Sequence, residues 1–522
     1  MKKHWILGII VAVLMPHAGF AQEIDTRAEI KALREKMERL ERKLATNEAA
    51  REKKAAEERA AITEKVKNDV ISEVSTKSQS YFSRLIQQTK IGAYGSTRYG
   101  TSNLDDLHNT FTYRRFVLTV DSPIADRLKV NLELEFERFT ELELEKTLSP
   151  TLSGGLTSEL AIEGNNESEI SLEQAWMQYD IVDWLKFRGG AVLVPLGRFN
   201  INHDDNRWDL PRRSLVDRGV PVLPTTAAWP ELGVGFLGDI SIGNTGKLNY
   251  QWYVMNGVAL DSEIELIGET RSRDTTKVAY EVKLQPSRGT FSDDVKSGKS
   301  IGTRWAYSPW LGDEIAASFY WGRYTPDYLS NRPVFSIAVD GKKTWGPFEV
   351  EGQYVHTRWG GVRSIANGIA RRAISSEGEV DDIETEVEFE IANLASSKQG
   401  YWVDLRYRFW PEFLSTTILG RHFANPQLIA TLRWEQVWFK GLIKEISFSN
   451  GSLTHYKEEN RLLNRVTVGL TYRPVPLIAL QLAYENTRTN RGKSLASVTN
   501  FLPARNGEYF QNALLMGLAF GF

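Results

Sequence analysis

The chain ends in the stretch ALLMGLAFGF, which runs from Ala513 to Phe522. Every second residue of this stretch is large and apolar, whereas alanine and glycine fill most of the positions between them. Leu515 is the exception on the second face. Successive side chains of a β-strand point to opposite faces of the sheet. The C-terminus therefore predicts a strand with one strongly apolar face, which carries Leu514, Met516, Leu518, Phe520 and Phe522.

The same alternation recurs from about residue 90 onward, in segments such as 131–137, 401–409, 465–473 and 478–485. A soluble β-sandwich also alternates, with its charged face toward bulk water. Here the strands run for roughly ten residues and carry aromatic residues near their ends, which is typical of strands that face lipid. Short turns separate some of them and long polar inserts separate others. We expect 16 or 18 antiparallel strands.

Composition supports a barrel rather than a helical membrane protein. After the N-terminus the sequence has no apolar run of the roughly 18 residues that a membrane-spanning helix needs. Only helices and closed barrels satisfy every backbone polar group in lipid. The absence of cysteine excludes disulfides and thiolate metal sites. The near balance of 64 basic and 66 acidic residues argues against a nucleic-acid partner. The expected fold is an all-β transmembrane barrel over residues 89–522, wide enough for an aqueous interior.

The N-terminus reads as a signal peptide over residues 1–21. Lys2 and Lys3 precede an apolar core, and Gly19 and Ala21 are the small residues of a cleavage site. The mature chain would then begin at Gln22 in the periplasm. A short membrane anchor is the alternative.

Residues 22–88 are predicted to form a periplasmic coiled-coil stalk. The region from 24 to 88 contains neither glycine nor proline. Its apolar residues follow steps of three and four, which places them on one seam of a helix. The seam consists of Ile30, Leu33, Met37, Leu40 and Leu44. A narrow apolar stripe must be buried against a partner, and a homotrimer is the expected arrangement. A single helix packed on the barrel is the alternative.

The long irregular segment at about 194–230 is the candidate functional region. Its prolines cannot lie inside a central strand, and a loop of this length is usually functional or disordered. We expect it to enter the barrel and form a pore constriction, where opposed charges would select solutes by charge and size. An extracellular loop or a trimer contact is the alternative. The candidate constriction residues are Arg198, Asp204, Asp205, Arg207, Asp209, Arg212, Arg213, Asp217 and Arg218.

Strand parity also predicts which charged side chains face the interior of the barrel. They occupy the positions opposite the apolar face of each strand. The candidate lumen-facing charges are Arg115, Glu133, Glu135, Glu137, Asp404, Arg406, Arg408, Arg465 and Arg473.

The run Leu193–Asn200, LVPLGRFN, follows the strand at 175–179 and resembles the phosphate-selective porin O and P family. In that family a comparable strand leads into a Gly-Lys/Arg-Phe element and a long loop. The resemblance implies an outer-membrane porin for small hydrophilic solutes or ions, with phosphate among the possible anions. Such proteins use an arginine ladder and a lysine cluster. Lysine is sparse in the central strands here, and carboxylates share the inward face, so a general or mixed-charge pore is equally expected.

The resemblance to outer-membrane proteins also implies that the barrel-assembly machinery reads Phe522 on the last strand. Other expected partners are outer-membrane lipid and the transported solutes. No cofactor, metal or catalytic residue is expected, because no histidine lies in a Gly-x-Ser-x-Gly or His-Glu-x-x-His context. The alternative function is a structural tether whose coiled coil reaches toward the cell wall.

Overall fold

The computed structural model describes residues 26–103, 109–137, 142–150, 156–164, 169–219, 222–271, 276–289, 291, 294, 296–375, 383–391, 394–450, 452–491, 493, 495 and 509–522. The predicted signal peptide, residues 1–21, lies outside these residues. The chain divides into two compact units, Met1–Ile86 and Gln87–Phe522.

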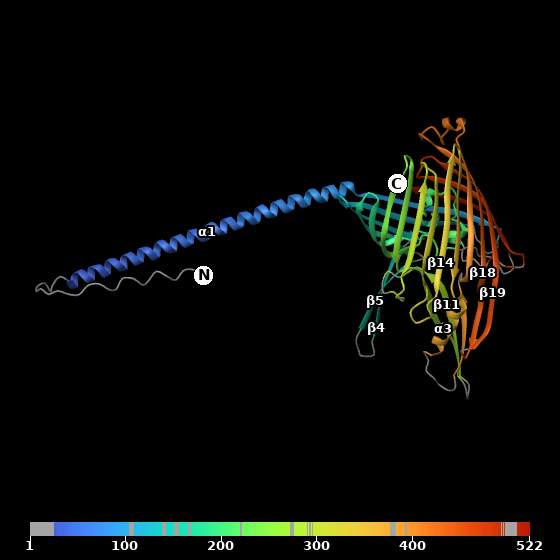
Figure 1. The fold of residues 1–522 in the computed structure, drawn as a ribbon, viewed down its shortest axis with the longest axis horizontal. Coiled ribbons are helices and arrows are strands. Elements are labelled where there is room, and N and C mark those ends of the chain that lie inside the picture. The colour runs from blue at the N-terminus through green and yellow to red at the C-terminus, as the bar shows by residue number, and fades with distance from the viewer. Residues whose placement is uncertain are drawn as a thin grey trace. The chain divides into compact units, whose positions relative to one another are not determined.

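The first unit contains one long α-helix, α1, which extends over Thr26–Gln88 (Figure 1). The helix agrees with the absence of glycine and proline from this region. Met37 and Leu40 of the seam are each 57% exposed in the single chain. The side chains of Ile30, Leu33 and Leu44 are not among those described, and the coiled coil stays a prediction. No helix in the described part of the chain is long and apolar enough to cross a membrane.

The second unit is a closed antiparallel β-barrel. Nineteen strands form one hydrogen-bonded sheet, and sixteen of those described close into a ring. Around the ring the order is β1, β2, β3, β6, β7, β8, β9, β12, β13, β14, β15, β17, β18, β19, β20, β21 and again β1. Figure 1 shows its long strands, including β14, β18 and β19, running side by side. The barrel prediction is confirmed, with 16 strands rather than 18.

The ring strands have the following bounds: β1 Lys90–Ser102, β2 Thr110–Ala125, β3 Leu128–Glu137, β6 Glu169–Val182, β7 Leu185–Leu193, β8 Pro230–Ile242, β9 Gly246–Met255, β12 Ser300–Ser308, β13 Glu314–Arg323, β14 Pro333–Trp345, β15 Phe348–Trp359, β17 Ala395–Phe409, β18 Gln427–Ser449, β19 Ser452–Arg473, β20 Ala479–Thr489 and β21 Phe510–Gly521. Short turns such as Ala125–Leu128 and Val182–Leu185 lie at one end, which we call the short-turn rim. Most of the long connections lie at the other end, whereas the long connection between β17 and β18, residues 410–426, lies at the short-turn rim.

Five further strands belong to the long connections. β10 (Ala259–Arg271) and β11 (Thr276–Ser287) form a hairpin, and β16 (Ile383–Ile391) pairs with β11 and β18. β4 (Leu142–Pro150) and β5 (Leu156–Gly164) form a separate hairpin. Acidic and apolar residues alternate along β16, from Glu386 to Glu390. The same connection holds the helix α3 (Val362–Ser375).

The two faces of the barrel differ in the way that strand parity predicts. In β21, Leu514, Met516 and Leu518 are exposed, whereas Ala513 and Leu515 are buried. The exposed apolar positions recur around the ring, as at Val468, which is 55% exposed. An exposed apolar belt on a closed barrel is the surface that contacts lipid. Charged side chains gather on the inward face instead.

Val468→Arg places a charge on this outward belt. We expect it to lower the free energy of unfolding in lipid vesicles by about 2–4 kcal/mol, the cost of arginine near the bilayer midplane. The matched control is Leu477→Arg in the turn before β20, where about 0–1 kcal/mol is expected. Urea titrations followed by tryptophan fluorescence would measure both values. Equal costs for the two variants would show that Val468 does not face lipid.

Candidate functional site

The connection between β7 and β8 leaves the sheet and packs against the inward faces of the strands. It contains α2 (Arg198–Ile201), the short 3-10 helix η1 (Asp205–Arg207) and the π-helical turn η2 (Leu215–Gly219). Its apolar side chains are buried, which an extracellular loop in water would not achieve. They are Val194, Leu196, Phe199, Trp208, Leu210, Leu215, Val216, Val222, Leu223 and Trp229.

The first part of the segment is attached to β13 and β15. The guanidinium of Arg198 lies 2.7 Å from Glu314 of β13 and also pairs with Glu351 of β15. The backbone N–H groups of Arg198 and Phe199 donate to the side-chain oxygen of Gln353, at 2.6 and 3.1 Å. Backbone and side chain therefore fix this part of the segment together.

The middle of the segment reaches β17, β19 and β20. Arg473 of β19 donates to Asp209 at 2.8 Å, and Arg406 of β17 lies 3.3 Å from the other carboxylate oxygen. The carbonyl of Trp208 accepts from Arg473 at 2.9 Å and from Gln481 of β20 at 2.7 Å. The segment leaves the ring at β7 and returns to it at β8, and β17, β19 and β20 lie on the opposite part of the ring, so the segment crosses the barrel interior.

Asp205 connects the segment to β1 and β2. It accepts hydrogen bonds from Ser96 of β1 and from Arg213 at 3.2 Å, and Arg115 of β2 lies 3.4 Å away. Arg115 is fully buried and also pairs with Glu135 and Glu173, at 2.7 and 2.9 Å. Three carboxylates thus surround one guanidinium, which offsets the cost of burying the charge.

The turn η2 contacts β15, β17 and β18. The backbone N–H of Leu215 donates to Glu435 of β18 at 2.7 Å. Asp217 is fully buried and accepts from Gln353 at 2.8 Å and from the indole of Trp402 at 3.0 Å. Burial raises the pKa of the Asp217 carboxyl to about 6, and these hydrogen bonds oppose the rise.

Aromatic rings and arginines pack together where the segment meets β17 and β18. Phe199 stacks on Trp208 with 4.6 Å between ring centroids, and Trp208 meets Trp402 edge to face at 5.5 Å. The guanidinium of Arg433 lies 5.3 Å from the Trp402 ring centroid, and that of Arg406 lies 5.8 Å from the Trp208 ring. These contacts add cation–π attraction to the ion pairs.

His203 joins the segment to β6. Its Nε2 lies 3.2 Å from Glu173 and its Nδ1 lies 3.1 Å from the carbonyl oxygen of Asn200. Burial lowers the pKa of His203, but Glu173 outweighs it and raises the pKa to about 9. Both nitrogens then donate. Glu133, Glu173 and His203 are close enough to hold a metal ion, but Arg115 already neutralises Glu173. The arrangement fits a protonated imidazole better than a metal ligand.

The remaining candidate constriction residues lie in different surroundings. Arg207 has a side chain that is 61% exposed and pairs with Asp204 at 2.7 Å. Arg212 lies 2.8 Å from Glu485 of β20. The side chain of Arg218 is not among those described. Most of the predicted charges thus lie against the barrel wall, whereas the pair of Arg207 with Asp204 lies within the segment itself.

The predicted lumen-facing charges take part in ion pairs and hydrogen bonds along the barrel wall. Asp404 pairs with Arg406 and Arg433, both at 2.6 Å. Arg408 is half-buried and pairs with Glu349 at 3.0 Å. Arg465 lies 3.8 Å from Glu435 and donates to Thr487. Glu133 accepts from Gln174, and Glu137 is half-buried in β3.

Four arginines surround a small cavity of about 20 Å³ beside the segment. They are Arg98 of β1, Arg114 of β2, and Arg212 and Arg213 of the segment. Two of them, Arg98 and Arg114, were missed by the sequence analysis. Simple parity places Arg114 outward when Arg115 points inward. The register shifts between Ser96 and Thr97, which pair with Arg115 and Tyr113, so Arg114 is the extra residue of a β-bulge.

A β-bulge re-aims the side chain of its extra residue, and here it brings two consecutive arginines to the interior. Among the described residues, no acceptor lies within hydrogen-bond distance of the buried Nη1 atom of Arg98. The cavity therefore holds an excess of positive charge beside Asp205 and Glu485.

Comparison with known proteins gives the following similarities. No family model matches the chain. It is 26% identical over 240 residues to an uncharacterized protein of Aquifex aeolicus (strain VF5), a match that covers 42% of this chain and 48% of that relative. The chain therefore spans about half the length of the curated relative that it matches.

Among solved structures, similar folds include outer-membrane channels. The anion-selective porin from Comamonas acidovorans has a TM-score of 0.45 and 10% identity, covering 83% of this chain and 99% of that one. The outer membrane channel DcaP of Acinetobacter baumannii has a TM-score of 0.41 and 13% identity, covering 83% and 97%. Salmonella typhi OmpF has a TM-score of 0.43 and 12% identity, also covering 83% and 97%.

Proposed function

We propose that this protein is an outer-membrane porin, a channel for passive diffusion of small hydrophilic solutes or ions. The observation that carries the proposal is the charged segment that crosses the interior of a 16-strand barrel. Fixed charges of both signs in a narrow passage impose a field on every solute that passes. The segment is tied to the wall by buried ion pairs, so it forms a rigid constriction rather than a mobile flap.

The finer proposal is a preference for anions. The arginine cavity lies where the segment approaches β1 and β2, and Arg98 has an unpaired guanidinium nitrogen there. A fixed cation at a constriction attracts anions and repels cations over a Debye length of roughly 8–10 Å. Phosphate remains one candidate anion from the sequence resemblance.

The topology follows from the same proposal. The short-turn rim and the α1 helix would lie in the periplasm, since an even strand count returns both ends of the barrel to one side. Three copies of α1 would bury the seam as a coiled-coil stalk of a homotrimer. The barrel-assembly machinery would recognise the terminal strand through Phe522. No enzymatic step is proposed.

A second candidate function is a structural tether. The helix α1 spans 63 residues, which corresponds to roughly 95 Å at the rise of an α-helix. Such a helix could reach toward the cell wall, with the barrel as its membrane anchor. Planar-bilayer recordings on the purified protein separate the two. Stepwise conductance supports the porin, and no conductance at any salt concentration supports the tether.

Arg98→Gln removes one charge from the arginine cavity without breaking an ion pair that the structure describes. We expect the anion-to-cation permeability ratio to fall, by roughly fivefold if about 1 kcal/mol of attraction is lost. Reversal potentials in a salt gradient measure the ratio. Arg207→Gln, an exposed arginine of the same segment, is the matched control and should leave the ratio unchanged. Identical ratios for both variants and the native protein would refute the anion preference.

The His203–Glu173 pair gives a pH dependence. The raised pKa of about 9 means that the imidazolium stabilises the fold fully below its ordinary value near 6.5. That stabilisation is lost as the pH rises through 9, when the proton leaves. We expect the melting temperature to fall between pH 8 and 10, together with noisier open-channel current from a looser segment. In His203→Gln this alkaline transition should disappear. A transition of equal size in that variant would contradict the assignment.

A further inference from the structure

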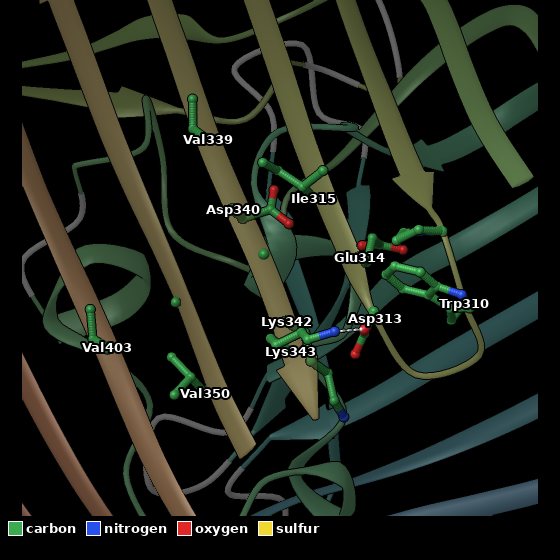
Figure 2. Close-up of a pocket in the computed structure, with 13 residues that line it drawn as sticks. Trp310, Asp313, Glu314, Ile315, Val339, Asp340, Lys342, Lys343, Val350 and Val403 are labelled. Atoms are coloured by element: carbon green, nitrogen blue, oxygen red, sulfur yellow. Dashed lines mark hydrogen bonds and ion pairs between the residues drawn. The ribbon is translucent and has the colours of Figure 1, made fainter. Parts of the chain in front are cut away.

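An apolar hollow of about 560 Å³ opens on the outward face of the barrel, across β13, β14, β15 and β17 (Figure 2). Its side walls are the outward apolar residues of these strands. Ile315 is 61% exposed and Val339 is 50% exposed, and Val350 and Val403 complete the walls. Figure 2 shows Val350 and Val403 on neighbouring strands at one side of the hollow.

Two glycines create the depression. Gly341 of β14 and Gly352 of β15 are direct partners in the antiparallel register, so two neighbouring outward positions have no side chain. A Cβ atom at Gly352 would lie 2.9 Å from the carbonyl oxygen of Trp402, and one at Gly341 would lie 3.0 Å from that of Glu314. The close approach of adjacent backbones therefore favours glycine, and the outward surface is hollow above it.

Opposite charges lie at the end of the hollow that meets the short-turn rim. Lys343 forms an ion pair with Asp313 of the β12–β13 turn, and its ammonium lies 5.0 Å from the centroid of the Trp310 ring. The side chain of Lys343 is 55% exposed, and Trp310 is 59% exposed. Figure 2 shows Trp310, Asp313 and Lys343 together at this end. Asp313 is only 8% exposed and also accepts from the backbone N–H of Thr344 at 2.9 Å, so the exposed groups at the mouth of this apolar groove are the ammonium of Lys343 and the ring of Trp310.

We propose that the hollow binds a zwitterionic phospholipid with a phosphoethanolamine headgroup. An acyl chain fills the hollow between Val339 and Val350, and the phosphate lies against Lys343. The primary ammonium lies against the exposed face of Trp310, which attracts cations. The exposed ring of Trp310 beside the Lys343 ammonium favours this occupant, since a headgroup that carries both a phosphate and a cation satisfies both groups. The site requires only that the outward belt lies in lipid, and it is independent of what the pore conducts.

Native mass spectrometry of the detergent-purified full-length protein tests the acyl-chain contact. Phosphatidylethanolamine or phosphatidylglycerol is added at equal concentrations, and we expect preferential retention of phosphatidylethanolamine. Val350→Phe places a larger side chain in the hollow and excludes the acyl chain. We expect retention of phosphatidylethanolamine to fall roughly tenfold, which corresponds to about 1.4 kcal/mol of lost binding free energy. Val468→Phe, an outward valine on β19, is the matched control and should retain the lipid.

A second pair of variants tests the headgroup. Lys343→Gln should remove the preference for phosphatidylethanolamine. Lys186→Gln, which breaks the 3.6 Å pair with Asp239 at another short turn, should leave it intact. Equal retention of both lipids by the native protein overturns the proposal. A Val350→Phe variant that still retains the lipid but has a different oligomeric state also overturns the proposal. That result would show that the hollow is an interface with a second copy of the chain and not a lipid site.

Discussion

The pairing of the first and last strands is the constraint on which the rest of the barrel depends. In lipid, a backbone N–H or C=O group without a protein partner costs several kcal/mol. β1 and β21 satisfy each other from Tyr94 opposite Gly521 to Ser102 opposite Ala513. The backbone N–H of Phe522 also donates to the carbonyl oxygen of Ala93 at 2.9 Å. Without the terminal strand, β1 and β20 would each expose an open edge.

Once the barrel is closed, the charged side chains that point inward need partners inside it. Every second side chain of each strand points into the barrel. In this chain many of these inward side chains are charged. A buried charge is costly unless it is paired and hydrogen-bonded. Asp404 serves this purpose between Arg406 and Arg433, both buried. The segment between β7 and β8 supplies further partners, since Asp205 and Asp209 neutralise arginines from β2, β17 and β19. The segment therefore completes the electrostatics of the wall.

The sequence predicts the parts of this structure that repeat. Alternation identifies the barrel and the apolar face of β21, and the absence of glycine and proline identifies the helix α1. The sequence alone does not distinguish 16 ring strands from 18. The strands β10, β11 and β16 alternate like ring strands, but they lie in the long connections. Proline and mixed charge identify the 194–230 segment, but the partners of Asp209 or Asp217 come from strands far away in the chain. Such pairings depend on register, which a single sequence does not determine.

The residues that simple parity misplaces lie beside the segment that crosses the barrel. One β-bulge makes Arg114 the extra residue in β2, and a second leaves Glu173 of β6 without a register partner opposite β3. Arg114 lines the arginine cavity, and Glu173 contacts Arg115 and His203. A bulge interrupts the ladder and disturbs alternation, so two bulges close to the same segment need a compensating benefit. Here the benefit is a higher density of charge at one level of the barrel. In a regular strand only every second side chain points inward, whereas a bulge lets two consecutive residues do so. Departures from local regularity are expected at functional sites, and these two departures coincide with the proposed constriction.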